Sequence, residues 1–83
     1  MTHALDLELQ HTEGILIRVL GLTERRGFLP VTVSIWPSGN GTVALSMTVY
    51  SERPVELLLR QLAKLLDVNN ITLVSQSLQQ AAK

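Results

Sequence analysis

The stretch ALDLELQHTEGILIRVL, residues 4–20, decides the fold because the spacing of its apolar residues changes within it. Up to Leu9 the leucines recur at every second position, with Asp6 and Glu8 between them, which is the pattern of a strand with one face toward solvent. From Gly14 onward the apolar residues recur at intervals of three and four, which is the pattern of an amphipathic helix. The stretch therefore predicts a strand followed by a helix.

Residues that are common at helix termini mark the two expected ends of this helix. Thr12 is a candidate N-cap, and Glu13 suits the positive end of the helix dipole. Arg25 and Arg26 suit the negative end, and Gly27 can adopt the left-handed conformation that follows many helices. We therefore expect the helix to end just before Gly27.

A predicted hairpin follows. FLPVTVSIW, residues 28–36, alternates as a strand, and its Pro30 predicts a sheet edge because proline cannot donate to a strand ladder. PSGNG, residues 37–41, is a five-residue turn cluster, and TVALSMTVY, residues 42–50, alternates again. The apolar residues expected on one face of the first of these strands are Leu29, Val31, Val33 and Ile35.

A second helix is predicted within SERPVELLLRQLAKLLDVNN, residues 51–70, with Pro54 in its first turn and Asn69 or Asn70 ending it at positive φ. Glu56 and Arg60 are spaced for a favourable pair. The expected apolar stripe consists of Val55, Leu58, Leu59, Leu62, Leu65 and Leu66. ITLVSQS, residues 71–77, is expected as the last strand, and residues 78–83 as a flexible tail.

The predicted order is βαββαβ, an α+β arrangement. Each helix has one apolar stripe, so both should cover the same face of a four-stranded antiparallel sheet. Right-handed crossovers then give the ferredoxin-like fold with strand order 4-1-3-2, in which the strand with Pro30 is an edge. We expect one domain over residues 1–83, with a core of about residues 4–77.

Composition narrows the classes of partner. The 83 residues include seven basic and seven acidic ones, which argues against nucleic acid or an anionic membrane as the partner. There is no cysteine, so no disulfide or thiolate metal site is available, and a small domain of this kind often dimerises. No apolar run approaches the about 20 residues of a membrane span, and the start MTHALDLELQ is unlike a signal peptide. A cytoplasmic protein is expected.

Several activities that use this fold are poorly matched. An acylphosphatase-type enzyme needs an anion-binding loop with an arginine nearby, but QHTEG has no arginine and carries Glu13. RNA binding of the RRM kind needs aromatic residues on the central strands, and none is present there. No nucleophile, carboxylate pair or metal-ligand spacing accompanies His11, so neither catalytic nor metal-binding residues are assigned.

Two motifs carry a family resemblance. EGILIRVLGLTERRGFLPVTVSI and LLLRQLAKLLDVNNITLVSQ resemble the ACT domain of acetohydroxyacid synthase (acetolactate synthase) small subunits. The chain looks most like the short small subunits, such as that of isozyme II. The matching residues are Gly14, Leu16, Arg18, Val19, Arg26, Gly27 and Phe28, then Gln61, Leu62, Lys64, Leu65, Asp67 and Val68.

The resemblance implies a non-catalytic regulatory subunit that binds and activates a large catalytic subunit in branched-chain amino-acid biosynthesis. No cofactor is expected on this chain, whereas thiamine diphosphate, FAD and Mg are expected on the large subunit. A homodimer is expected, and valine or another branched-chain amino acid is a possible effector.

The resemblance also implies an effector site against the loop after the first strand. Free N–H groups at a helix N-terminus bind carboxylates, and Gly14 allows close approach. The candidate effector-binding residues are His11, Gly14, Ile15 and Leu29, of which His11 and Leu29 depart from the family's polar pattern. The alternative is that Gly14 only permits a turn.

Contact with the large subunit has its own candidates. They are Arg25 and Arg26 at a helix end, Trp36 beside Pro37, and Leu57. Each has a plain structural alternative, as a solvated helix end, a cap on the core edge or an ordinary exposed leucine. Three hypotheses remain open: a regulatory subunit, a free-standing ACT amino-acid sensor dimer, and a small enzyme.

Overall fold

The alternation of strands and helices predicted from the sequence is present in the computed structural model, which describes residues 1–74. The strands are β1 (Thr2–Gln10), β2 (Leu29–Gly39), β3 (Thr42–Tyr50) and β4 (Val68–Val74), and the helices are α1 (Ile15–Arg25) and α2 (Val55–Ala63). Residues 75–77 of the expected last strand and the expected tail at 78–83 lie outside the described residues.

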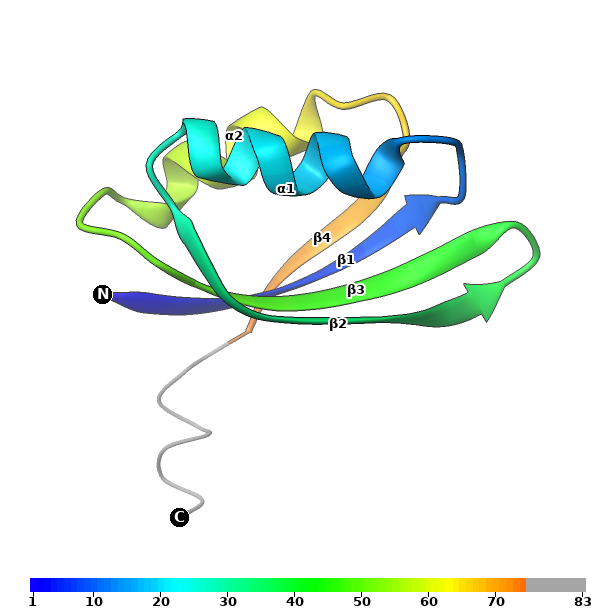
Figure 1. The fold of residues 1–83 in the computed structure, drawn as a ribbon, viewed down its shortest axis with the longest axis horizontal. Coiled ribbons are helices and arrows are strands. Elements are labelled where there is room, and N and C mark those ends of the chain that lie inside the picture. Colours follow the sequence, from blue (N-terminus) through cyan, green and yellow to red (C-terminus); the bar gives the residue numbers. More distant parts are fainter. Residues whose placement is uncertain (75–83) are drawn as a thin grey trace, which may run out of the picture.

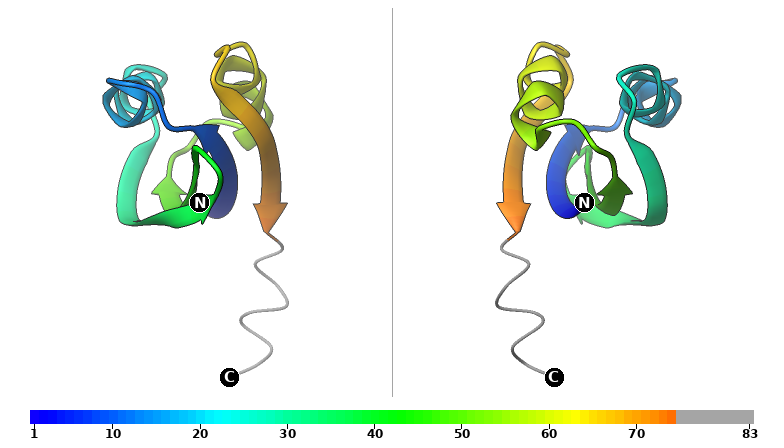
Figure 2. Two further views of the ribbon diagram at one scale, coloured as in Figure 1. Left: turned by 90° about the vertical axis from the view of Figure 1, so that its right-hand side faces the viewer. Right: turned by 90° about the vertical axis from the view of Figure 1, so that its left-hand side faces the viewer.

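The four strands form one antiparallel sheet in the order β2-β3-β1-β4, which confirms the predicted ferredoxin-like topology. β2 is an edge strand, as Pro30 predicts. Both helices cover the same face of the sheet, α1 on the side of β2 and α2 on the side of β4 (Figures 1 and 2). The other face of the sheet stays open.

The core lies between the helices and the covered face of the sheet. In β1 and β3 every second side chain is buried, as predicted, and the residues between them face solvent. The buried apolar residues are Leu5, Leu7, Leu9, Ile15, Val19, Leu22, Phe28, Val43, Leu45, Met47, Val49, Val55, Leu58 and Leu62. Within residues 1–74, no helix is long and apolar enough to cross a membrane.

The two ends of α1 differ from expectation at the start and match it at the end. Gly14, not Thr12, is the N-cap, with a left-handed φ of 81° and no capping hydrogen bond from a side chain. At the other end Gly27 has φ 90°, and its N–H donates to the Glu24 carbonyl while the Phe28 N–H donates to the Thr23 carbonyl. This pair of bonds is a Schellman motif, so the predicted role of Gly27 is confirmed.

β2 departs from the single apolar face expected for it. The strand pairing shifts by one residue between Pro30 and Thr32, so Val31 is the extra residue of a β-bulge. Val33 is opposite buried Met47 on the covered face, whereas Leu29 is opposite Tyr50 on the open face. The bulge thus moves Leu29 to the other side of the sheet.

The hairpin turn is shorter than the five residues predicted. β2 continues to Gly39, which pairs with Thr42, and only Asn40 and Gly41 connect the strands. Trp36 therefore lies within β2, opposite Ala44, and not at the hairpin tip. Figure 1 shows that the β2–β3 hairpin projects beyond the helices.

The second helix ends earlier than predicted. α2 stops at Ala63 and Pro54 is its N-cap, one position before the expected first turn. Leu66 is 94% exposed and outside the apolar stripe, and Asn69 and Asn70 belong to β4 with no positive φ. The reason is strand pairing: β4 begins at Val68, opposite Leu9 of β1, which leaves no room for two more helical turns.

Candidate functional site

A shallow pocket of about 270 Å³ lies at the start of α1. Three of the four expected effector-binding residues, His11, Gly14 and Ile15, line it. The loop that forms it is anchored at its first residue, because the His11 N–H donates to the Gly41 carbonyl across 2.9 Å. The remaining lining residues are Thr12, Glu13, Leu16 and Ile17.

The helix entrance offers backbone donors. Its first amide, on Ile15, donates to the Thr12 carbonyl, and the Arg18 amide donates to the Gly14 carbonyl. The amides of Leu16 and Ile17 between them have no backbone acceptor within residues 1–74. An alanine Cβ at Gly14 would lie 3.4 Å from Arg18 Nη1, so the glycine is required by its φ and not by crowding. The entrance can thus donate to a carboxylate.

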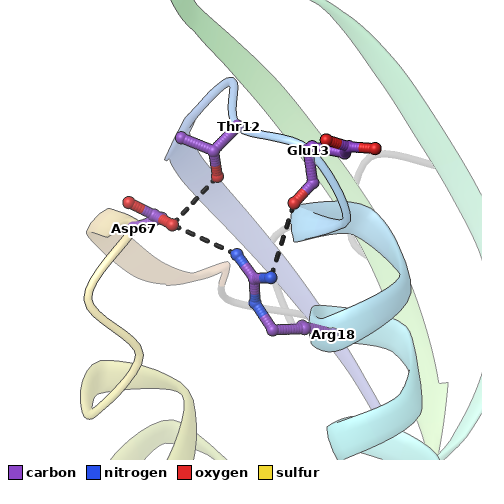
Figure 3. A network of polar contacts seen from close by, with 4 residues as sticks. All are labelled: Thr12, Glu13, Arg18 and Asp67. Carbon is purple, nitrogen blue, oxygen red and sulfur yellow. Dashed lines mark hydrogen bonds and ion pairs between the residues drawn. The ribbon is translucent and has the colours of Figure 1, made fainter.

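A polar network closes the side of the entrance that faces α2 (Figure 3). Arg18 Nη2 lies 3.2 Å from Asp67 Oδ2, and Thr12 Oγ1 donates to the same oxygen across 2.9 Å. Arg18 Nη1 also donates to the Glu13 carbonyl, at 3.4 Å. The network uses the Thr12 hydroxyl, which was expected to cap the helix, and neutralises Arg18.

Leu29 is not part of this pocket. It pairs with Tyr50, which in β1 corresponds to Thr2, whereas His11 directly follows the opposite end of β1. The eight residues of β1 between these ends span about 27 Å. Within one chain, therefore, Leu29 and Gly14 do not share a site, and only a second chain could bring them together.

The candidate partner-contact residues divide into two groups. Arg26 and Leu57 line a groove of about 220 Å³ between the end of α1 and the outer side of α2. We call this the basic groove; its lining residues are Arg26, Arg53, Leu57, Arg60, Gln61 and Lys64. Arg25 and Trp36 lie outside it, Arg25 with its guanidinium near Gly21 and Trp36 half exposed on the open face of the sheet.

Three cationic residues of the groove were not predicted as functional: Arg53, Arg60 and Lys64. A signal for two of them was available, because Arg60 and Lys64 are four residues apart and therefore share a helix face. Their meeting with Arg26 could not be inferred from spacing, since it depends on how α1 packs beside α2.

Among residues 1–74 no three His, Cys, Asp or Glu side chains are grouped so that they could hold a metal ion. The expected Glu56–Arg60 pair is not formed either, since Arg18–Asp67 is the ion pair found among these residues.

Comparison with known proteins gives a consistent family. The sequence model of the ACT domain matches residues 11–71. The acetolactate synthase small subunit of Buchnera aphidicola subsp. Schizaphis graminum is 30% identical over 79 residues, which are 93% of this chain and 50% of that protein. The chain thus spans about half the length of this curated relative.

Solved structures share the fold. The acetolactate synthase small subunit of Thermotoga maritima superposes with a TM-score of 0.80 at 23% identity, over 90% of this chain and 48% of that one. The ACT domain of the Chlorobium tepidum GTP pyrophosphokinase gives a TM-score of 0.76 at 10% identity, over 89% and 97%. The family match over residues 11–71, together with the βαββαβ sheet and helix layer, shows that this chain belongs to the ACT domain family.

Proposed function

We propose that this chain is a non-catalytic regulatory small subunit of acetolactate synthase, which binds the large catalytic subunit and raises its activity. The observation that carries the proposal is the 30% identity to an acetolactate synthase small subunit over 93% of the chain. The first of the two sequence motifs that resemble such subunits covers α1 and most of β2, and the second, as far as residue 74, covers most of α2, the loop after it and β4. A cytoplasmic location is part of the proposal.

The proposal assigns thiamine diphosphate, FAD and Mg to the large subunit and none of them to this chain. It also includes the supply of precursors of valine, leucine and isoleucine as the process that is regulated. The chain would act on the reaction only through contact with its partner.

A homodimer is the form in which we propose that the chain works. Val33 and Ile35 point to the helix-covered side of the sheet but are 38% and 43% exposed, and Ile17 on neighbouring α1 is 78% exposed. A second copy placed against the β2 edge would cover these side chains and the free backbone groups of that edge. Pro30 and the Val31 bulge interrupt the edge, so side chains and α1 would supply much of the contact.

The dimer can be tested with one substitution. Ile35→Asp would place a carboxylate among apolar side chains in the proposed interface, so we expect it to weaken dimerisation at least tenfold. The measurement is sedimentation equilibrium, with Asn40→Asp in the exposed turn as a control of equal charge change. An unchanged dissociation constant for Ile35→Asp would rule out this interface.

The same dimer would complete the binding site for an amino-acid effector. A branched-chain amino acid could place its carboxylate on the free amides of α1 and its side chain against Ile15 and Leu16. The pocket is open and Leu29 is far from it in one chain, so a closed site needs the second protomer. Valine binding is therefore proposed only for the dimer.

A free-standing ACT sensor dimer is the second candidate. It is favoured by the same pocket at the start of α1, which would serve an amino acid without any large partner. The two candidates differ in one respect: the sensor binds an amino acid alone, whereas the regulatory subunit changes the activity of another protein.

The deciding experiment measures acetolactate formation by the large subunit of the same organism, with and without this chain, across a valine titration. We expect a rise in activity when the chain is added. Suppression of that rise by millimolar valine would assign the pocket to feedback, and a rise that valine leaves unchanged would remove the effector from the proposal. If adding the chain changes nothing, the regulatory proposal is wrong, and calorimetry with amino acids tests the sensor.

A further inference from the structure

We propose that the basic groove is the surface by which this chain holds an acidic segment of its catalytic partner. The inference rests on the proposed function, because it names where the large subunit binds. The groove shares no lining residue with the pocket at Gly14, and it includes Arg26 after the end of α1 whereas the pocket lies at the start of α1, so it is a separate site.

Charge is concentrated in the groove although the chain has no net charge. Four of the seven Lys and Arg residues line it, namely Arg26, Arg53, Arg60 and Lys64. Within residues 1–74 none of the four makes an ion pair, since the pair found there joins Arg18 to Asp67. Grouped cations without counter-charges repel one another, and an anionic partner would remove that repulsion.

Nearby carboxylates do not supply the counter-charge. Glu52 precedes Arg53 in the chain, but its Oε2 accepts a hydrogen bond from the Tyr50 hydroxyl across 3.0 Å. Glu56 lies one turn before Arg60 on α2 without forming an ion pair with it. Because neither Glu52 nor Glu56 forms an ion pair with a groove cation, the groove keeps its positive charge.

Hydrogen bonds fix the backbone and one side chain that line the groove. The Ser51 hydroxyl donates to the Gly27 carbonyl across 2.7 Å, and the Arg53 N–H donates to the Ser51 hydroxyl across 3.0 Å. A Cβ at Gly27 would lie 2.7 Å from Arg53 Nε, so the missing side chain makes room for this guanidinium. On the opposite wall Arg26 Nη2 donates to Gln61 Oε1. The Arg26 guanidinium and the backbone of Arg53 are therefore positioned before any partner arrives, which lowers the entropy cost of binding.

The lining of the groove favours a protein segment over a small molecule. No buried side-chain polar atom within residues 1–74 lacks a hydrogen-bond partner, so no polar group waits for a ligand below the surface. Leu57 is 39% exposed among the cations, and arginine is enriched at protein interfaces relative to the rest of the surface. The partner segment should therefore combine Asp or Glu residues with an apolar side chain.

The test is binding of the full-length chain to the intact large subunit, measured by surface plasmon resonance at several salt concentrations. Arg60→Gln with Lys64→Gln should raise Kd about tenfold or more and flatten its salt dependence, because two screened attractions are lost. Asn40→Asp and Asn70→Asp together remove the same net charge at exposed positions away from the groove and should leave Kd within about twofold. Arg60→Lys with Lys64→Arg keeps both charges and should restore binding.

The outcomes separate the proposal from the function on which it rests. If the native chain binds and activates the large subunit while the doubly neutralised chain does so equally well, the groove proposal is overturned and the proposed function stands. If the native chain does not bind at all, both are overturned. If neutralisation abolishes binding of inorganic pyrophosphate, measured by calorimetry, but not of the large subunit, the groove is a small-anion site and the proposal is again overturned. Both substituted side chains are exposed, and circular dichroism checks that the variants fold.

Discussion

The two ends of helix α1 are built from the same element but present opposite surfaces. Each end has a glycine with a left-handed φ, Gly14 at the start and Gly27 after the end. At the start, Asp67 neutralises Arg18, and the pocket beside it includes the apolar side chains of Ile15, Leu16 and Ile17. At the end, the groove cations form no ion pair with any carboxylate of residues 1–74.

The difference shows how one helix can serve two kinds of recognition. A partly apolar entrance that has free amides and is also lined by Glu13 suits a small zwitterion, whereas a positive groove suits an acidic surface. Both ends have a glycine with left-handed φ, so the side chains of α2 and its flanking loops determine which kind of ligand each end suits. Substitutions at the glycines and at Asp67 can break this comparison.

The largest effect is expected from a side chain at Gly27. Gly27→Ala must adopt φ 90° and place its Cβ 2.7 Å from Arg53 Nε. A left-handed alanine costs about 1–2 kcal/mol, and turning the exposed Arg53 side chain aside adds a smaller cost, so we expect a loss of unfolding free energy of about 2 kcal/mol. Urea denaturation of the full chain measures it.

Gly14 and Gly41 provide matched controls for Gly27→Ala. Gly14 has φ 81° with only ordinary contact to Arg18, and Gly41 has φ 70° with nothing within 4 Å of a built Cβ. Alanine at either position should lower the free energy of unfolding only by the cost of the left-handed backbone conformation, about 1–2 kcal/mol. In an Arg53→Ala background the excess loss at Gly27 should disappear. Equal losses at all three glycines would mean that Gly27 does not make room for Arg53.

The fold could be predicted because its signals are local. The central strands show period two, β1 over residues 4–10 and β3 over residues 42–50, and α1 is bounded by glycines that change the period. The errors lie where distant pairing overrides local preference. Leu65 and Leu66 continue the helical spacing, but β4 must start at Val68 to pair with Leu9, and α2 ends accordingly.

The candidate site was only partly accessible from sequence for the same reason. His11, Gly14 and Ile15 are neighbours along the chain, so their pocket follows from one local turn. Leu29 is displaced by the bulge at Val31, which no residue pattern announces. The basic groove joins residues from α1, the β3–α2 loop and α2, so its charge appears only when the helices are packed side by side.

A smaller effect is expected at the α1 entrance. Asp67→Asn removes the charge that neutralises Arg18 while keeping an oxygen that can accept from Thr12. Because the Arg18 side chain is 49% exposed and screened by solvent, we expect a loss of at most about 1 kcal/mol. Urea denaturation of Asp67→Asn, Arg18→Gln and the double variant gives the coupling energy between the two residues.

Salt sharpens the test at Asp67. A coupling of about 0.2–1 kcal/mol should shrink toward zero in about 1 M NaCl, where charges are screened within about 3 Å. A coupling that persists unchanged at high salt would show that packing, and not charge, joins Arg18 to Asp67. The contrast between the two ends of α1 would then not be electrostatic.

The smallest effect concerns Tyr50, which reports where Glu52 points. The hydrogen bond to Glu52 and the negative charge of that carboxylate raise the pKa of Tyr50 above its usual value of about 10. The protonated phenol is therefore favoured in the folded chain, and this contribution to stability is present below about pH 10 and lost as the pH rises through the raised pKa. Tyr50 is the only tyrosine, so absorbance at the phenolate band follows it alone.

Glu52→Gln should lower the pKa of Tyr50 back toward its usual value, because both the charge and the stronger acceptor are removed. Glu56→Gln, also exposed and of equal charge change, should leave the titration unaltered. If Glu52→Gln leaves the pKa of Tyr50 unchanged, Glu52 is free to turn toward Arg53 and neutralise part of the groove. The titration of one exposed phenol thus tests whether the end of α1 is as positive as its contacts indicate.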